Sequence, residues 1–350
     1  MTQPITIALD AMGGDKAPGI VFKGVDIARK RHPDVHFLLY GDERLLAPIL
    51  KRFPKLADRC EIRHAPQVIA AEDKPSQALR RGKESSMRLA INAVRAGEAG
   101  GVVSAGNTGA LLAMSKFVLK TVEGIDRPAM AGVVPTGRGE SVILDLGANI
   151  ECTADNLVQF AIMGTEFARS VLGVRRPKVG LVNVGTEEMK GHEDVKLAAQ
   201  ILRESTDLPL AFEGFVEGDD IGLGTVDVFV TDGFTGNIAL KTAEGTAKFY
   251  SEMLRKGFRR SLLARVGYLL VRPALQAIRK KVDPRNYNGA LFVGLNGVVV
   301  KSHGGTDAIG FANAVGVAAD LIRGRFNDQI VADLQTISNQ GEQSSEAAVS

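Results

Sequence analysis

Short runs of β-branched and apolar residues alternate with amphipathic helical patterns along almost the whole chain, and this alternation restricts the possible folds more than any other feature. Several runs are apolar on both faces, as strands covered by helices on both sides must be. The alternation therefore predicts an α/β fold with a mostly parallel sheet flanked by helices. The strand patterns lie at 4–9, 35–40, 100–104, 130–135, 141–146, 178–184, 209–213, 226–231 and 297–302. The helical patterns lie at 17–32, 76–96, 108–121, 154–172, 187–205, 237–256 and 306–325.

The chain has 350 residues, a length that fits one large domain or two intimate ones. No internal repeat and no low-complexity linker divides it. We expect one α/β unit over 1–338, or two subdomains that share a sheet, with a helical protrusion at 246–285. The small and polar residues 339–350 predict a loose tail.

Neither the cysteine content nor the N-terminus indicates secretion. Cys60 and Cys152 are too few for a disulfide framework, so we expect a reducing compartment and two small, buried thiols. No basic segment precedes the first apolar run, which predicts a strand and not a signal peptide. No window holds the roughly 18 uninterrupted apolar residues of a membrane span. The sequence predicts a cytoplasmic protein that at most rests on a membrane surface.

The charge of the chain is concentrated in one segment. The net charge is +3, yet residues 255–285 contain ten Lys or Arg and one acidic residue, Asp283, which gives this segment a charge of +9. An acidic partner is therefore expected to meet the chain there.

The same segment carries an apolar stripe at helical spacing, which Phe258 extends by one turn. The stripe consists of Leu262, Leu263, Val266, Leu269 and Leu270. Arg259, Arg260 and Arg265 lie largely off it, and Pro273 is expected to kink or end the helix. The pattern suits an anionic membrane surface or an acidic protein, and a helix that packs in a dimer remains an alternative. Nucleic acid fits poorly, because the stripe is aliphatic and no known binding module accompanies it.

Glycine-rich turns follow five of the predicted strands, at 9–15, 104–110, 145–149, 183–188 and 231–237. The carboxyl ends of parallel strands line one crevice, where ligands bind. Helix N-termini there present free N–H groups, and glycine lets an oxyanion approach the backbone closely. We therefore expect the five turns to form one site for phosphate or a carbonyl oxygen. Neither a dinucleotide fingerprint nor a phosphate-loop motif occurs, which argues against dinucleotides and nucleoside triphosphates.

The ionisable candidates are few. Lys190 follows the fourth turn and could hold a phosphate or polarise a thioester, although a solvated lysine is an equal alternative. His192 is expected to be an exposed loop residue, and His303 lies at another strand end, where a site role and a structural role are both open.

Four aspartates could bind a metal, but their scattered positions argue against a metal site. They are Asp10, Asp15, Asp145 and Asp232. No nucleophile elbow and no Cys–His arrangement occurs, so acyl transfer would not need a covalent enzyme intermediate. No metal and no cofactor is expected.

Seven motifs together resemble the bacterial phosphate acyltransferases of phospholipid synthesis. They are ALDAMGGDKAP, DKPSQALRRGKESSM, VSAGNTGALLA, LDLGAN, NVGTEEMKG, TDGFTGNIALKTAEG and NGVVVKSHGGTDA, in order from residue 8 to about 316. The chain departs from the family pattern at 288–294 and at His192. A decarboxylating dehydrogenase of the same fold group and a non-catalytic scaffold for a carrier protein or membrane are the alternatives.

The resemblance implies a fold similar to the isocitrate/isopropylmalate dehydrogenase and phosphotransacetylase group, and a homodimer attached peripherally to the inner face of the membrane. It further implies transfer of a fatty acyl chain from acyl carrier protein to inorganic phosphate. The acyl phosphate would then serve an acyl-phosphate-using glycerol-3-phosphate acyltransferase.

We expect phosphate to attack the thioester directly. The residues expected to act in catalysis are Lys190, Asn107, Asn149, Asn237 and His303. The residues expected to bind phosphate or the oxyanion are Gly106, Thr108, Gly109, Gly147, Gly185, Thr186 and Gly233. The carrier protein or the membrane is expected to meet Arg259, Arg260, Leu262, Leu263, Arg265, Val266, Leu269 and Leu270, or the basic patch of Arg80, Arg81 and Lys83.

Overall fold

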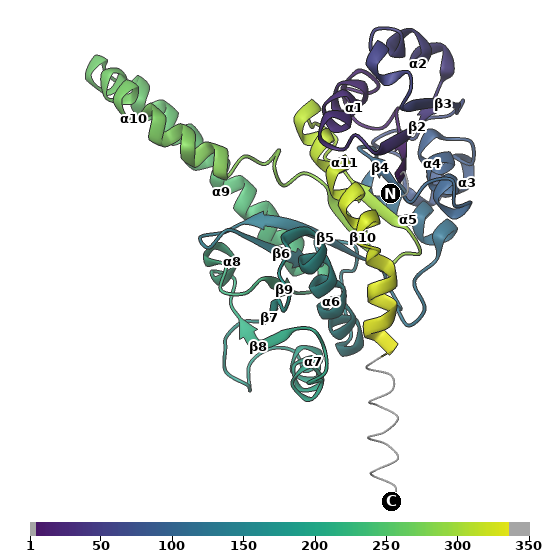
Figure 1. Cartoon of the computed structure of the whole chain (residues 1–350). Helices are drawn as coiled ribbons and strands as arrows, with labels where there is room; N and C mark the ends of the chain where they lie inside the picture. Colours follow the sequence, from purple (N-terminus) through teal and green to yellow (C-terminus); the bar gives the residue numbers. More distant parts are fainter. Residues whose placement is uncertain (1–4, 336–350) are drawn as a thin grey trace, which may run out of the picture.

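The computed structural model, which describes residues 5–335, contains one twisted sheet of 11 strands with helices on both faces (Figure 1). The strand order is β3-β2-β1-β4-β11-β10-β5-β6-β9-β7-β8. The predicted α/β class with a mostly parallel sheet is confirmed. The predicted tail at 339–350 lies outside the described residues.

The sheet has two parallel halves. The first half consists of β3 (Cys60–His64), β2 (Val35–Gly41), β1 (Ile5–Asp10), β4 (Gly101–Ser104) and β11 (Val298–Lys301). The second half consists of β6 (Glu140–Leu144), β9 (Val228–Val230), β7 (Lys178–Val182) and β8 (Ala211–Val216). Between the halves lie β10 (Ala290–Val293) and β5 (Ala129–Pro135).

The two halves run in opposite directions, because β10 pairs antiparallel with β11 and with β5, and β5 pairs antiparallel with β6. The carboxyl ends of β1, β4 and β11 therefore form one edge of the sheet, which we call the first rim. The carboxyl ends of β6, β9 and β7 form the opposite edge, which we call the second rim. The expectation that all five turns share one crevice is wrong, since two turns lie on the first rim and three on the second.

Helices cover both faces of the first half of the sheet. One face packs against α1 (Gly19–Arg31) and α11 (Ala308–Arg323), and the other against α4 (Ser86–Arg95) and α5 (Thr108–Leu119). The shorter helices at the periphery are α2 (Glu43–Leu50) and α3 (Pro75–Arg81).

The second half packs against α6 (Ala154–Phe167) and α7 (Glu193–Glu204) in the same core cluster as α1 and α11. Its other face has a smaller cluster that includes Leu240. That leucine belongs to α9 (Gly233–Arg259), while α8 (Asp220–Leu223) is a single short turn. The second half is therefore thickly covered on one face and thinly on the other.

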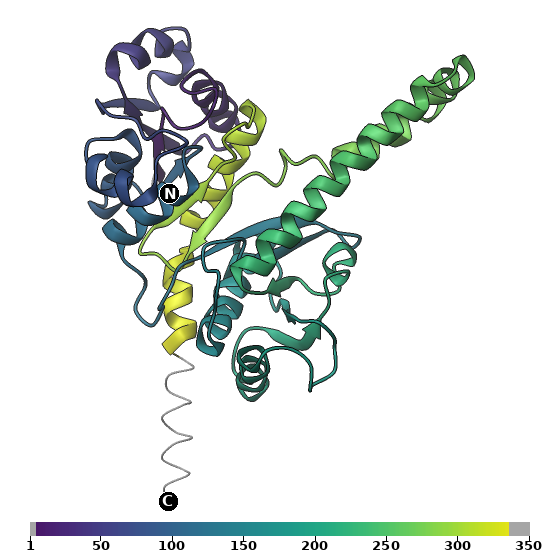
Figure 2. The ribbon, with the colours of Figure 1, turned by 180° about the vertical axis from the view of Figure 1, so that it is seen from behind.

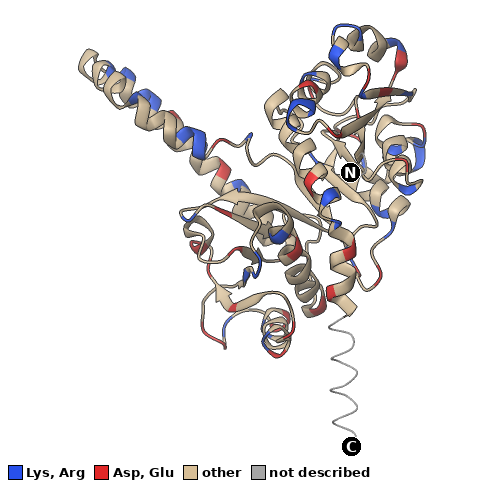
Figure 3. Cartoon of the chain, viewed as in Figure 1, with Lys and Arg blue, Asp and Glu red and all other residues tan. Residues whose placement is uncertain are grey.

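An arm of two helices leaves the second half of the sheet and extends away from the body (Figures 1 and 2). It is formed by α9 and α10 (Leu262–Lys281), which pack together with the rings of Phe258 and Tyr268 5.3 Å apart. Of the α9 residues only Gly233 and Gly236 are buried, and none of α10 is. Lys and Arg are concentrated along the arm (Figure 3).

All nine predicted strands form, but β3 and β10 were missed, as were α2 and α8. The predicted helix at 76–96 is two helices, because α3 ends at Gly82 and Ser85 caps α4. Pro273 does not end the helix, which was one of the two expected outcomes, since α10 continues through it. The break in the basic segment instead precedes Ser261, whose hydroxyl caps α10, so Phe258 belongs to α9.

Candidate functional site

A buried carboxylate organises the turn that follows β1. Asp10 accepts hydrogen bonds from the hydroxyls of Ser86 and Ser104 at 2.6 and 2.7 Å, and from the backbone of Met12 at 3.3 Å. Burial raises the pKa of Asp10, and these hydrogen bonds oppose the rise. Asp10 is therefore a structural anchor of the first rim and not an exposed metal ligand.

Asp145 does the same for the turn after β6. Its carboxylate accepts the backbone N–H groups of Gly147, Ala148 and Asn149 at 3.1, 3.0 and 2.7 Å. Gly147 has a φ of +127°, a conformation that favours glycine. Amides 147–149, which were predicted to bind an oxyanion, are therefore not free donors in this structure, because Asp145 accepts all three.

Two of the predicted catalytic asparagines are also engaged internally. The carboxamide of Asn107 donates to the carbonyls of Ala71 and Asp73, and its oxygen caps α5 at Ala110 N–H. The carboxamide of Asn149 donates to Pro128 O and to Asp145 at 2.9 and 2.8 Å. Both side chains hold their turns together, and neither offers a free donor to a substrate in this conformation.

The turn after β7 differs, because its amides are free. The backbone N–H groups of Gly185 and Thr186 have no hydrogen-bond partner within residues 5–335. The Lys190 ammonium lies 2.8 Å from Glu187, whose carboxylate raises the pKa of Lys190 through their hydrogen bond. A Cβ on Gly185 would lie 2.5 Å from the Lys190 side chain, so the lysine folds closely over the turn and would have to move for a larger residue.

Asn237, one turn into α9, lies against the turn after β6. A Cβ on Gly147 would be 3.6 Å from the Asn237 Cβ, and the Asn237 carboxamide makes no hydrogen bond within the described part of the chain. Gly233 donates its N–H to Asn149 O at 2.6 Å, so this predicted phosphate-binding amide is occupied. Asn237 is the asparagine of the predicted set with a free carboxamide.

The strand order β6-β9-β7 brings the three turns of the second rim side by side, with the start of α9 in the middle. The free donors of this rim are the amides of Gly185 and Thr186 and the Asn237 carboxamide, and the exposed Lys190 ammonium, which is paired with Glu187, lies beside Gly185. Together they can bind an oxyanion such as phosphate.

The first rim holds the remaining predicted residues. The N–H of Gly106 bonds Ser104 Oγ at 3.0 Å, whereas the N–H groups of Thr108 and Gly109 at the start of α5 have no partner among residues 5–335. His303 accepts the Gly305 N–H on Nδ1 at 3.1 Å. Within one chain these groups lie on the opposite sheet edge from Lys190, so they cannot share a cage with it.

Lys301, which was not among the predicted site residues, is 9% exposed at the end of β11. Its ammonium donates to Ser302 O, and burial lowers the pKa of Lys301 to about 8. A lysine at the end of an apolar strand gave no sequence signal of burial.

The second rim also exposes a set of large apolar side chains that were not predicted to belong to a site. They are Ile150 (71% exposed), Val184 (76%), Met189 (85%), Phe234 (59%) and Ile238 (48%). On the first rim, within the described residues, the comparable side chain is Ile309 at 37%. The second rim therefore combines oxyanion donors with apolar surface, and the first does not.

Cys152 lies beside the second rim, with its sulfur 4.0 Å from Asn149 O. Burial raises the pKa of this thiol to about 12, so it stays protonated near neutral pH. Since the thiolate is the nucleophilic form, Cys152 is a poor nucleophile here.

The arm carries the residues predicted for carrier-protein or membrane contact. Arg259 ends α9, Arg260 lies in the break, and the stripe runs along α10 with Leu262 78%, Leu263 82% and Leu270 79% exposed. Val266 and Leu269 are 56% and 63% exposed. No helix within residues 5–335 is long and apolar enough to cross a membrane.

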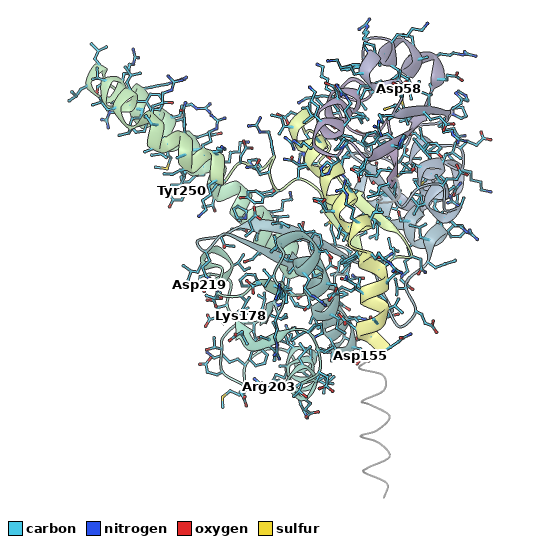
Figure 4. All side chains as sticks on the ribbon, viewed as in Figure 1. Asp58, Asp155, Lys178, Arg203, Asp219 and Tyr250 are labelled. Carbon is cyan, nitrogen blue, oxygen red and sulfur yellow. The ribbon has the colours of Figure 1, made fainter. Side chains whose placement is uncertain are left out.

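A hollow of about 720 Å³ lies away from the second rim, at the amino-terminal ends of β2 and β3. His36, Asp58 and Arg59 are among the residues that line it. Asp58 lies at the far end of the first half, whereas Lys178 and Arg203 lie in the second half (Figure 4).

Within the described range, no group of three or more His, Cys, Asp or Glu is placed to hold a metal ion.

Solved structures share the architecture. The chain is similar to a phosphotransacetylase of Streptococcus pyogenes, with a TM-score of 0.63 and 19% identity over 91% of this chain and 94% of that one. It is also similar to the EutD phosphotransacetylase of Staphylococcus aureus, with a TM-score of 0.59 and 17% identity over the same shares. At these identities the likeness establishes the fold alone, and it confirms the expected fold group.

Sequence relatives are much closer. A family model described as fatty acid synthesis protein matches residues 5–329. A phosphate acyltransferase of Rhodospirillum centenum is 63% identical over 330 residues, which cover 94% of this chain and 93% of that protein. A phosphate acyltransferase of Rhodospirillum rubrum is 59% identical over 94% of both chains. The chain is therefore an acyltransferase, and it belongs to the fatty acid synthesis protein family, among the bacterial phosphate acyltransferases.

Proposed function

We propose that the second rim transfers a fatty acyl group from the thioester of acyl carrier protein to inorganic phosphate. Acyl transfer to phosphate is the coarser activity that the named relatives support. The observation that carries the assignment to this rim is that Lys190, two free amides and the Asn237 carboxamide lie on neighbouring turns of this rim, together with exposed apolar side chains.

The proposed reaction is a direct displacement. A phosphate oxygen attacks the thioester carbonyl carbon, the new C–O bond forms, and the carbonyl oxygen becomes an oxyanion. When the intermediate collapses, the C–S bond breaks and the carrier leaves as its thiolate, with acyl phosphate as the other product. Phosphate is nucleophilic near neutral pH and the thiolate leaves readily, so no enzyme nucleophile is required.

Each free donor has a role in this scheme. Lys190 and the amides of Gly185 and Thr186 would bind phosphate, while the Asn237 carboxamide would donate to the oxyanion. Gly147 and Gly233 would let the reactants approach closely without donating. Holding both reactants together can lower the barrier by roughly 7–11 kcal/mol.

The first rim would act separately. The free amides of Thr108 and Gly109, together with Gly106 and the ring of His303, offer a second surface for an anionic group of a substrate or partner. Asn107 and Asn149 would act only by holding their turns.

The arm would bind acyl carrier protein and the anionic inner face of the membrane. Its Arg and Lys side chains complement both acidic surfaces, and the α10 stripe would enter the lipid interface. We further propose a homodimer, because in one chain neither α9 beyond Gly236 nor the apolar stripe of α10 has a buried residue. The product would pass to an acyl-phosphate-using glycerol-3-phosphate acyltransferase.

The test is release of free thiol from an acyl carrier protein thioester by the purified protein. We expect release that depends on phosphate and is absent with sulfate. Release that is equal with phosphate and sulfate would show hydrolysis, and no release with either anion would remove the proposed donor.

A further inference from the structure

We propose that the exposed apolar side chains of the second rim form the surface on which the fatty acyl chain lies, and that they determine chain-length preference. This inference rests on the proposed function of that rim. The surface consists of Ile150, Val184, Met189, Phe234 and Ile238, which we call the rim patch.

The rim patch is contiguous with the oxyanion donors. The Gly233 N–H bonds Asn149 O at 2.6 Å, which places the next residues, Ile150 and Phe234, beside each other. Parallel pairing of Leu181 with Val230 places the turn after β7, with Val184, next to the start of α9. Met189 directly precedes Lys190 along the chain.

Exposed apolar side chains that are grouped on one surface differ in meaning from exposed apolar side chains that are scattered. Single exposed apolar side chains are normal on a protein surface, but contiguous patches mark binding sites. All three turns of this rim contribute to the patch, whereas the ends of β1, β4 and β11 contribute Ile309, and Leu45 and Val68 follow β2 and β3 at the same sheet edge. The difference between two otherwise similar rims points to a ligand of the second rim.

A fatty acyl chain fits this place better than other apolar ligands do. When the thioester carbonyl lies against the Asn237 carboxamide and the phosphate against Lys190, the first methylenes of the chain must leave the site over neighbouring surface. Phe234 and Ile238 are spaced four residues apart and share one face of α9, so they extend this surface away from the turns. Each methylene that leaves water there would strengthen binding roughly fourfold.

The experiment compares hexadecanoyl and octanoyl thioesters of acyl carrier protein at saturating phosphate, by thiol release. In Met189→Ser and Phe234→Ser we expect the ratio of kcat/KM for the long chain to that for the short chain to fall about tenfold. The conservative Phe234→Leu should restore most of the ratio. Leu45→Ser, on an equally exposed leucine of α2, is the matched control and should keep the wild-type ratio.

Two outcomes overturn the inference. An unchanged ratio in both serine variants means that the chain lies elsewhere. A change in oligomeric mass by light scattering with an unchanged ratio assigns the rim patch to a subunit interface.

A second measurement separates this inference from the proposed function. Binding of a dansyl-labelled fatty acid needs no turnover, and we expect the serine variants to weaken it about tenfold relative to Leu45→Ser. If the wild-type protein shows no phosphate-dependent thiol release, the proposed function fails. Loss of probe binding in the variants would then still support the rim patch as an acyl site, and unchanged probe binding would reject it.

Discussion

The two rims of the sheet have a similar arrangement of turns, and they differ in which side chains and amides remain available to a ligand. On each, a buried aspartate follows a strand and holds a glycine-rich turn, with Asp10 on the first and Asp145 on the second. The first rim has a buried lysine, Lys301, and an exposed one, Lys16, whereas the second exposes Lys190 beside unpaired amides and apolar side chains. Glycine-rich turns at strand ends therefore do not define a site by themselves, because most of their donors can be satisfied internally.

The largest expected effect is loss of Lys190. In Lys190→Ala we expect turnover to fall about 10²–10³-fold with the fold intact, because a charge that stabilises the phosphate is removed. The matched control is Lys16→Ala on the first rim, where the lysine is exposed and reaches Gly305 O at 3.4 Å. Thiol release measures both variants. Equal loss in the two variants, or a near-normal Lys190→Ala, would remove the distinction between the rims.

Replacing Asn237, whose carboxamide is free, and replacing Asn149, whose carboxamide is hydrogen-bonded, should have different effects on turnover and on stability. We expect Asn237→Ala to lower kcat about 10–100-fold at an unchanged Tm, because its carboxamide supports no internal bond. Asn149→Ala should lower stability by about 1–3 kcal/mol, because Pro128 O and Asp145 lose a buried donor. Thermal unfolding and thiol release together check the pair, and a destabilised Asn237→Ala would contradict the assignment.

A buried carboxyl group near the end of α6 predicts a pH dependence unrelated to either rim. Burial, together with the neighbouring Asp333, raises the pKa of Glu166 to about 7 from 4.5. The native state then binds more protons than the unfolded state between these values, so stability should fall as pH rises from about 5 to about 8. We expect a loss of roughly 1–3 kcal/mol.

Glu166→Gln should flatten this dependence, since the amide mimics the protonated acid. Urea unfolding at several pH values measures it. A wild-type protein whose stability rises over this range would contradict the predicted sign, and one whose thiol release follows the same titration would connect Glu166 to the chemistry after all.

The smallest expected effect on turnover is at the arm. Replacing Leu262, Leu263 and Val266 together with Ser should release the protein from anionic liposomes, because the exposed stripe of α10 is lost. Turnover in solution should change less than about threefold. Co-sedimentation with phosphatidylglycerol vesicles measures binding, and retained binding would assign the stripe to contact with another subunit.

The α/β class could be predicted from the sequence because apolar strand patterns are local signals. Strand direction could not, since β10 pairs antiparallel with both β11 and β5, which leaves those two strands parallel, and the antiparallel pairing of β5 with β6 then reverses the second half. That one reversal, between two strands that were both predicted, is the reason that the five turns do not share a crevice.

The residue types of the site could also be predicted, whereas the state of each donor could not. Asn149 and Asn237 look alike in a motif, and only their surroundings decide that one is bonded and the other free. Burial of Lys301 and exposure of Met189 likewise depend on packing between segments far apart in the sequence.

Amide hydrogen exchange with and without phosphate tests the central claim most directly, because it reports where the anion binds without requiring turnover. We expect phosphate to protect the amides of residues 183–190 and to leave those of 105–110 unchanged, with sulfate as the control for a general anion effect. Protection of 105–110 with no change at 183–190 would contradict the account and assign the phosphate site to the first rim.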